Sequence, residues 1–303
     1  MATRGRIDER QNSPDCQALL RAAAVAHRHG QRVQAVSLAV SLCVAGFGLV
    51  ARRISSIGPT VVVVGALWAA TYAVFVVPWS GRYLRTSAIV QEMIDVSLFD
   101  LPWNWFAVGD PMSDDEVSRL SRQFHGDPRR LRDYYLVARV PAPYDVAFCL
   151  EQNLAWGSRV RRRFADVLIT MVALWCGLGL LLGIVTNSTI GGLVSGWFVP
   201  SLGLLLLCLD IYRAQVSITR ERTRVLGLLR AAVDESASPV FTSGESFTVF
   251  ARQIQNTLFS MRARQARVPA WFFRRFHDQD LTDFRFKMQV LETRFRDEAA
   301  AAP

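Results

Sequence analysis

The chain has 303 residues, of which 51% are hydrophobic and 20% are charged, and its formal net charge is +9. A positive mean hydropathy combined with this much charge indicates apolar blocks that alternate with polar ones. The five cysteines show neither paired nor metal-type spacing, which argues against a disulfide framework.

The first 32 residues form a polar, arginine-rich segment. Within it, Ser13-Pro14-Asp15 supplies a capping serine, a proline at the first helical position and an early acid, which together predict the start of a helix. We expect residues 1–32 to contain this helix and expect that it can run on into the first apolar block.

Four apolar blocks lie along the chain in two closely spaced pairs. The third and fourth carry no charge over 19 and 20 residues, and a helix of about 20 residues crosses the hydrocarbon layer of a membrane. Buried helices of a soluble protein are the alternative, but their apolar runs rarely exceed about 14 residues. Short links join each pair, so we expect two transmembrane hairpins, 33–79 and 164–212. The blocks are Val33–Ala51, Thr60–Trp79, Val167–Val185 and Ile190–Leu209.

The central polar segment, residues 80–163, contains several helix signals. Ser113-x-x-Glu116 is a capping box, and Asp127-Pro128 predicts the start of another short helix. Pro143 begins a further helix, which can continue through Leu154, Trp156 and Val160 into the third apolar block.

The C-terminal region, residues 213–303, first extends the helix of the fourth block to about Ala232. Thr242-x-x-Glu245 then caps a second helix, and a polar helix from about Asp280 ends the chain. Alternating strand patterns are almost absent. The sequence therefore predicts an all-α integral membrane protein, with four transmembrane helices as two hairpins and helical cytoplasmic segments.

Arginines gather in the long polar segments. Six precede the first apolar block, six flank the central segment and five closely follow the fourth block, whereas the hairpin links hold two. By the positive-inside rule, the N-terminus, the C-terminus and the central segment are cytoplasmic. Excess positive charge is also compatible with nucleic-acid binding, but membrane topology explains most of it, so we predict no DNA or RNA partner.

Neither a catalytic site nor a metal site is predicted. His27 and His29 lie on opposite faces of a helix, and His125 and His277 have no partner in sequence. No apolar block has Asp, Glu, Lys or Arg at mid-depth, which argues against a proton-coupled carrier or an ion pump. We therefore expect no enzyme activity and no cofactor.

Small residues recur four apart in three of the apolar blocks. This spacing is typical of faces through which membrane helices approach closely, within one subunit or between subunits. Four apolar helices packed in one bundle leave no aqueous channel, so conduction would require several copies. The helix-packing residues are Gly65 and Ala69, Gly179 and Gly183, and Gly192 and Gly196.

Arginines beside aromatic residues near the C-terminus are the remaining chemical signal. A guanidinium pairs with phosphate oxygens and an aromatic face stacks on a base, so this segment is a candidate nucleotide-binding site. The same side chains could instead contact anionic lipid headgroups. The candidate ligand-binding residues are Arg262, Arg267, Trp271 and Arg275, with Trp103 and Asn104 behind them.

Several stretches occur in an order that matches a family pattern. In them the chain resembles the SMODS-associated four-transmembrane effectors, and the similarity covers nearly its whole length. Asn256 and Ala270 depart from the pattern at positions where an acid is usual, which leaves the local hydrogen bonding open. The stretches are Arg10-Gln11-Asn12, Leu101-Pro102-Trp103-Asn104, Glu151–Trp156 followed by Arg159 and 161–163, Ile254-Gln255, and Val268-Pro269-Ala270-Trp271.

The resemblance implies a role in bacterial anti-phage defence by cyclic-oligonucleotide signalling (CBASS). In such systems a nucleotidyltransferase encoded nearby makes a cyclic nucleotide on infection. The effector senses it and permeabilises the inner membrane, so that the infected cell dies or stops growing. We expect a homo-oligomer in the bacterial inner membrane. Two rivals are a small-molecule transporter or constitutive channel, which would conduct without a nucleotide, and a non-conducting membrane scaffold.

Overall fold

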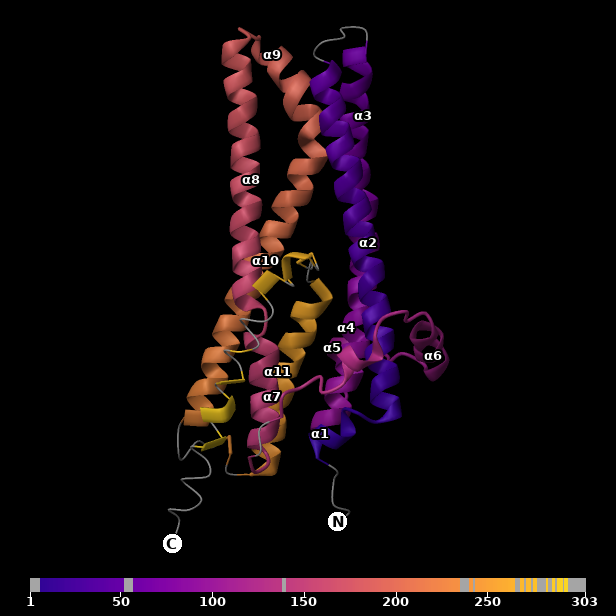
Figure 1. Ribbon diagram of the computed structural model, residues 1–303, viewed down its shortest axis with the longest axis vertical. Helices are drawn as coiled ribbons and strands as arrows, with labels where there is room; N and C mark the ends of the chain where they lie inside the picture. Colours follow the sequence, from indigo (N-terminus) through magenta and orange to yellow (C-terminus); the bar gives the residue numbers. More distant parts are fainter. Residues whose placement is uncertain are drawn as a thin grey trace. The chain divides into compact units, whose positions relative to one another are not determined.

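The structure is a computed structural model, and nearly all of the residues that it describes are helical (Figure 1). None of the described residues forms a β-strand, so the predicted all-α fold is confirmed. The described residues are 6–51, 57–137, 140–234, 240–241, 243–264, 268–269, 271–273, 275–276, 282, 285–286, 288–290 and 292–293.

The helical elements follow the predicted blocks, with three short non-α turns among them. Two of these turns, η2 and η4, are π-helical, and η3 is a 3-10 helix. In chain order the elements are α1 (Ile7–Arg10), α2 (Pro14–Ala51), α3 (Gly58–Thr71), η2 (Tyr72–Val76), α4 (Val77–Phe99), α5 (Trp105–Val108), α6 (Asp114–Arg122), η3 (Pro128–Leu131), α7 (Tyr144–Ala155), α8 (Ser158–Val185), α9 (Ile190–Leu193), η4 (Val194–Phe198), α10 (Val199–Asp234) and α11 (Gly244–Arg264).

Four helical runs are long and apolar enough to cross a membrane, and each contains one predicted block. Many of their large side chains, such as Leu67, Phe75 and Ile184, are exposed on the surface of the chain. Exposed apolar surface of this kind is stable against lipid rather than against water. The runs are Pro14–Ala51, Gly58–Phe99, Tyr144–Val185 and Ile190–Asp234.

Side-chain caps begin several of the helices at or near the predicted residues. The hydroxyl oxygen of Ser13 accepts a hydrogen bond from the backbone N–H of Cys16 (3.3 Å), and that of Ser113 accepts one from the N–H of Glu116 (3.4 Å). The predicted cap Thr242 and the helix start at Asp280 lie outside the described residues. The hydroxyl of Ser243 accepts from the N–H of Ser246 (3.0 Å) at the start of α11.

The prediction that one helix continues from Pro143 into the third span is wrong. The chain breaks between α7 and α8, where Gly157 has a φ of +71°, a value that favours glycine. The break leaves carbonyl groups at the end of α7 without helical partners. Arg222 donates to two of them, those of Asn153 (2.7 Å) and Trp156 (3.2 Å), and so stabilises the interruption.

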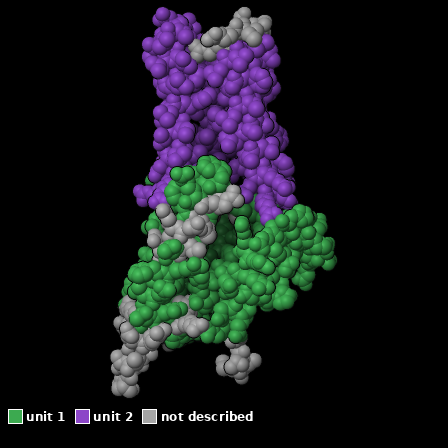
Figure 2. All heavy atoms as spheres, in the orientation of Figure 1, with its two compact units in different colours: residues 1–27, 84–160, 218–303 green, residues 28–83, 161–217 purple. Residues whose placement is uncertain are grey.

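The chain forms two compact units, each assembled from separate stretches of sequence (Figure 2). Unit 1 contains residues 1–27, 84–160 and 218–303, and unit 2 contains residues 28–83 and 161–217. Unit 2 thus holds the four predicted apolar blocks, and unit 1 holds most of the polar sequence.

In unit 2, glycines let rings and backbone approach closely. A Cβ atom on Gly65 would lie 2.7 Å from the Cα of Pro200, and one on Gly48 would lie 2.7 Å from the Cβ of the same proline. A Cβ atom on Gly179 would overlap the indole nitrogen of Trp197. These positions therefore require glycine, because any larger residue would push the helices apart.

The other predicted packing residues have more varied surroundings. Ala69 is buried. A Cβ atom on Gly183 would lie 3.1 Å from the side chain of Leu193, while one on Gly192 would meet only the Thr189 hydroxyl of its own turn (3.2 Å). Gly196 presents its carbonyl oxygen to Gly48, 3.4 Å from where a Cβ atom would stand.

Two tryptophans also form hydrogen bonds between helices of unit 2. The indole N–H of Trp68 donates to the hydroxyl of Ser41 (2.9 Å), and that of Trp175 donates to the hydroxyl of Ser201 (3.0 Å). A polar group inside an apolar span needs such a partner, so these bonds fix which helix faces meet.

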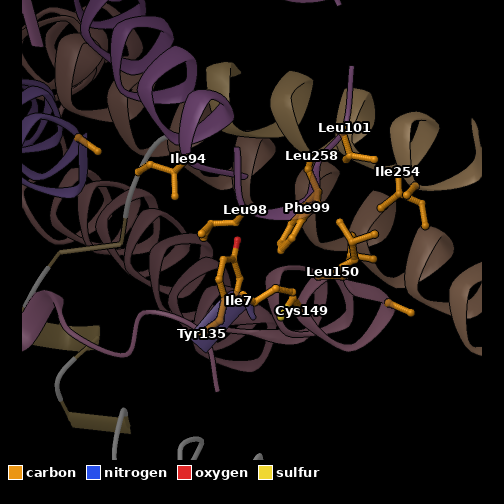
Figure 3. Close-up of a cluster of buried hydrophobic side chains, with 14 of the residues drawn as sticks. Ile7, Ile94, Leu98, Phe99, Leu101, Tyr135, Cys149, Leu150, Ile254 and Leu258 are labelled. Atoms are coloured by element: carbon orange, nitrogen blue, oxygen red, sulfur yellow. The ribbon is translucent and has the colours of Figure 1, made fainter. Parts of the chain in front are cut away.

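Unit 1 has a conventional hydrophobic core at the meeting point of α2, α4, α7, α10 and α11. Figure 3 shows part of it, with the ring of Tyr135 lying among Leu98, Phe99 and Cys149. Leu150 and Leu258 are fully buried in the same cluster. This apolar core surrounds an unusual set of charged side chains.

Candidate functional site

Two carboxylates lie inside unit 1, on the face of α4 that packs into its core. Glu92 and Asp95 are three residues apart, so they project from neighbouring positions of one helix face. Their exposed fractions are 0% and 1%. Two buried carboxylates destabilise a fold strongly unless cations and hydrogen-bond donors compensate them.

Helix α11 supplies that compensation. Arg252 forms an ion pair with Glu92, and Arg262 donates to Asp95 at 2.6 Å. The amide nitrogen of Gln255 lies between them and donates to both carboxylates, at 2.9 Å to Glu92 and 2.8 Å to Asp95. Two negative charges are thereby matched by two positive ones in the protein interior.

The electrostatic effects of burial are visible in the pKa values. Burial raises the pKa of the Glu92 carboxyl, and the Arg252 guanidinium opposes that shift. Burial alone would lower the pKa of Arg262, but the Asp95 carboxylate reverses the effect, so the pKa of Arg262 is raised. Arg262 is therefore a permanent cation whose charge is already neutralised.

Tyr135 extends this cluster toward α7 and α1. Its hydroxyl donates to Asp95 and accepts from the side-chain amide of Asn153 (2.7 Å). Burial and the nearby Asp95 raise the pKa of Tyr135 well above its ordinary value, so the hydroxyl keeps its proton and remains a donor. Gln11 holds the backbone of Tyr135 from both sides, at 2.8 Å to its N–H and 3.2 Å to its carbonyl. We call the six residues Glu92, Asp95, Tyr135, Arg252, Gln255 and Arg262 the polar network.

The neighbours of Gln11 stabilise two aspartates in left-handed backbone conformations. Arg10 makes two hydrogen bonds, at 2.8 and 3.0 Å, to the carboxylate of Asp100, whose φ is +54°. Asn12 exchanges hydrogen bonds with Asp133, whose φ is +51°. Aspartate tolerates this region better than most residues, and the side-chain contacts offset the remaining strain. The Arg10-Gln11-Asn12 stretch thus ties α1 to three distant points of unit 1.

The corner after α4 joins the network through its amide side chains. The side-chain oxygen of Asn104 caps α5 by accepting from two backbone N–H groups, and its nitrogen donates to the side-chain oxygen of Asn256 (3.1 Å). Arg252 donates to the same oxygen of Asn256 (3.0 Å) and to the carbonyl of Pro102 (3.1 Å). The family usually has an acid at position 256. In this chain the side-chain oxygen of Asn256 accepts both hydrogen bonds, so the asparagine supplies the acceptor that an acid would supply.

The structure connects only some of the candidate ligand-binding residues. Arg262 is buried in the network, and Asn104 is linked to it through Asn256 and Arg252. Trp103 is half-buried, and its indole N–H donates to the carbonyl of Gly109 (2.8 Å).

The remaining candidates lie elsewhere in the chain. Trp271 is 65% exposed and packs edge-on against Phe272, and Arg275 is exposed. Among the described residues, neither forms a hydrogen bond or ion pair with the network. Arg267 and Ala270 lie outside the described residues.

Sequence reasoning missed Glu92, Asp95, Tyr135 and Arg252. The sequence did contain a signal. Glu92 and Asp95 lie three residues apart on the apolar face of one helix, and arginine and glutamine side chains lie on the apolar face of another helix, α11. Within the described residues, no group of three or more His, Cys, Asp or Glu side chains could hold a metal ion. The network consists of two acid–arginine ion pairs that Gln255 and Tyr135 connect by hydrogen bonds.

Four membrane-length helices and a helical unit closed by buried charge pairs define a multi-pass membrane protein of the all-α class. Comparison with known families then makes the assignment specific. The chain belongs to the SMODS-associating 4TM effector domain family, whose model matches residues 5–291. The family resemblance seen in the sequence is therefore confirmed.

A curated relative supports the same grouping. The chain is 23% identical over 277 residues to a probable CBASS effector molecule of Bacillus cereus strain VD146, and the match covers 88% of this chain and 91% of that protein. No solved structure matches the chain significantly.

Proposed function

We propose that this protein is a cyclic-nucleotide-responsive effector that oligomerises and permeabilises the bacterial inner membrane in CBASS anti-phage defence. The observation that carries the proposal is the family match over nearly the whole chain, together with a relative named as a probable CBASS effector. A nucleotidyltransferase would supply the signal, and both termini would lie in the cytoplasm.

The place of the resembling stretches supports unit 1 as the sensing part. Residues of four of them make specific contacts in or beside the polar network: Gln11, Asn104, Asn153 and Gln255. Side chains from α1, α4, α7 and α11 must all keep their positions for this network to close. A ligand that binds one arrangement of these helices better than another would shift the equilibrium between them.

The Arg262–Asp95 ion pair suggests how an anionic ligand would act. In the arrangement described here, Asp95 neutralises Arg262 at 2.6 Å. We propose that a phosphate of the ligand replaces Asp95 as the partner of Arg262 in the active state, which would release α11 from α4. The ligand would first contact Trp271, Arg275 and Arg267. Release of α11 would then break the hydrogen bond between Asn104 and Asn256, so that Trp103 and Asn104 at the start of α5 would be free to move.

We propose no enzymatic step. Among the described residues, the buried acids Glu92, Asp95 and Glu151 all accept hydrogen bonds from arginine or glutamine side chains. A carboxylate held in this way serves structure rather than proton transfer. The effect on the membrane would instead come from assembly of several copies, because the four apolar blocks carry no Asp, Glu, Lys or Arg at mid-depth to line an aqueous path within one copy.

Dye release from sealed vesicles tests the proposal. Purified protein is reconstituted with a trapped dye, and a panel of cyclic dinucleotides and trinucleotides is added singly. We expect release with one member of the panel and none without it. Release in the absence of any nucleotide would indicate a constitutive channel, and no release with any member would favour a scaffold. Protein-free vesicles are the control.

The same distinction can be made in cells. Co-expression with an active nucleotidyltransferase of the same system should be toxic, whereas co-expression with a catalytically dead one should not. A scaffold would be harmless in both cases, and a constitutive channel would be toxic in both.

A further inference from the structure

The short helix α5 exposes two aromatic side chains. Trp105 is 59% exposed and Phe106 is 104% exposed, which makes Phe106 the most exposed large hydrophobic side chain among the described residues. We call these two consecutive residues the aromatic pair. Exposing large aromatic side chains to water is unfavourable in free energy, so this exposure indicates a site that contacts a partner molecule or lipid.

The aromatic pair is held rigidly. The side chain of Asn104 accepts from the N–H groups of Phe106 and Ala107, both at 3.1 Å. The indole of Trp103 bonds to the carbonyl of Gly109 at 2.8 Å, which closes the turn on its other side. Val108 is completely buried. The chain therefore fixes α5 from within and still presents both rings to the outside.

Chain connectivity keeps α5 near the membrane. Arg85 donates to the carbonyl of Val108 at 2.9 Å, so α5 is fastened to this point of α4. Arg85 follows Trp79, the last residue of the predicted second span, by six residues. Six residues reach at most about 21 Å when extended, and about 9 Å as the helix that α4 forms here. The attachment point of α5 thus lies close to the membrane surface.

The flanking charges suit an anionic lipid surface. Arg82 and Arg85 are both exposed. The Arg85 guanidinium lies 5.8 Å from the ring centroid of Phe259, and this cation–π contact fixes the orientation of the Arg85 side chain. Arginines at a membrane boundary are attracted to lipid phosphates, and aromatic rings settle at the level of the headgroups. The combination is typical of side chains that rest in the interface of a bilayer.

A second protein molecule is a weaker candidate for the same surface. Two aromatic side chains bury roughly 150–250 Å² each, which falls well below the roughly 1,000 Å² expected of a stable protein interface. Lipid contact needs no such area, because the spans already hold the chain at the membrane.

We propose that Trp105 and Phe106 insert into the headgroup region of the anionic leaflet and anchor α5 to the bilayer surface. This anchor would connect α11 to the lipid through Asn104, whose side-chain nitrogen donates to the side-chain oxygen of Asn256 at 3.1 Å. The proposal does not depend on a nucleotide, so its test is independent of the dye-release test.

Photo-crosslinking from position 106 tests the proposal. The photoreactive residue p-benzoylphenylalanine replaces Phe106 in the full chain, which is reconstituted in vesicles of phosphatidylethanolamine and phosphatidylglycerol and irradiated. We expect lipid adducts, detected by mass. Asp115 in the acidic first turn of α6 is the control position, because acids are repelled by an anionic surface, and it should give no lipid adduct.

Each other outcome overturns the proposal. Adducts at twice the mass of the chain would show that the pair contacts a second copy, and absence of adducts at position 106 would show that it faces water. Equal lipid adducts at positions 106 and 115 would show unspecific reaction.

The substitution should leave the unfolding temperature in detergent unchanged, because Phe106 is fully exposed. Omitting phosphatidylglycerol should lower the adduct yield, and an unchanged yield would contradict an anionic surface.

Discussion

Units 1 and 2 close their interiors by different means. In unit 1, an apolar core surrounds buried acids that are matched by arginine, glutamine and tyrosine side chains. In unit 2, close contacts form where glycines meet Pro200 and Trp197, and two hydrogen bonds join tryptophans to serines. The first arrangement depends on matched charges, and the second depends on shape.

This difference suggests a division of labour. Charge pairs resist separation unless another charge replaces the lost partner, and for this reason we propose that unit 1 responds to an anionic ligand. The packing of Pro200 and Trp197 against glycines involves no charges, so ions do not affect it. It changes only when a whole helix shifts against its neighbour. We propose that ligand sensing takes place in unit 1 and that unit 2 acts on the membrane.

The largest effect is expected at the centre of the polar network. Replacing Asp95 with alanine leaves the buried Arg262 guanidinium without its anion, which should lower the free energy of unfolding by about 3–5 kcal/mol. Denaturant unfolding in detergent measures the change. Asp110→Ala, at an exposed acid, is the matched control and should change little.

A double variant separates lost charge pairing from lost packing. Asp95→Leu combined with Arg262→Met removes both charges and should be less destabilising than Asp95→Ala alone. If Asp95→Ala unfolds at the same denaturant concentration as Asp110→Ala, the charge pairs do not hold unit 1 together.

The next effect is expected in unit 2. A methyl group on Gly65 would meet backbone atoms, at 2.7 Å from the Cα of Pro200 and 2.9 Å from the carbonyl oxygen of Val199. Because backbone moves less easily than a side-chain tip, Gly65→Ala should cost about 1–3 kcal/mol in the same unfolding assay. Gly46→Ala, with nothing within 4 Å, is the control. Equal stability of the two variants would mean that unit 2 is loosely packed.

A smaller effect is expected where the chain departs from its family. Asn256→Ala removes the acceptor shared by Asn104 and Arg252 and should cost about 1–2 kcal/mol. Asn256→Asp keeps both hydrogen bonds and adds a charge opposite Arg252, so it should unfold no earlier than the wild-type protein. A loss of stability in the aspartate variant would show that the amide is specifically required.

The smallest effect is expected when the chain is not mutated and two buried cysteines of unit 1, Cys16 and Cys149, report whether its core is accessible to reagents. Burial, with a further contribution from Asp95, raises the pKa of Cys16 to about 11, and burial raises the pKa of Cys149 well above its ordinary value. At pH 8 only about a thousandth of the Cys16 thiol would be ionised. Mass spectrometry after maleimide treatment should find both thiols unmodified in the folded protein and modified after unfolding. Rapid modification without denaturant would indicate that unit 1 is open.

The sequence predicted the spans well, because uninterrupted apolar length is a local property. The capping box at Ser113 was equally local and was found. The break at Gly157 was missed, since a lone glycine is compatible with a helix until Arg222 from a distant helix stabilises the interrupted end.

The site was harder to predict than the fold. Glu92 and Asp95 look like solvent-facing acids on α4, and only the meeting of α4 with α11 shows them as buried partners of Arg252 and Arg262. The π-helical turns η2 and η4 each end two residues before a proline, Pro78 and Pro200, and a proline indicates a local distortion without specifying a π turn. Contacts between elements far apart in the chain decide these features, and a pattern within one element does not contain them.

Membrane sidedness tests the central claim of this account, that the spans cross the bilayer and that unit 1 lies in the cytoplasm. Single cysteines replace Asp115 in unit 1 and Ser188 in the link between the third and fourth spans. Intact spheroplasts are then treated with a membrane-impermeant maleimide, and the wild-type protein controls for its native cysteines. We expect labelling at position 188 and none at position 115 until the membrane is permeabilised. Labelling at position 115 in intact spheroplasts would contradict the account.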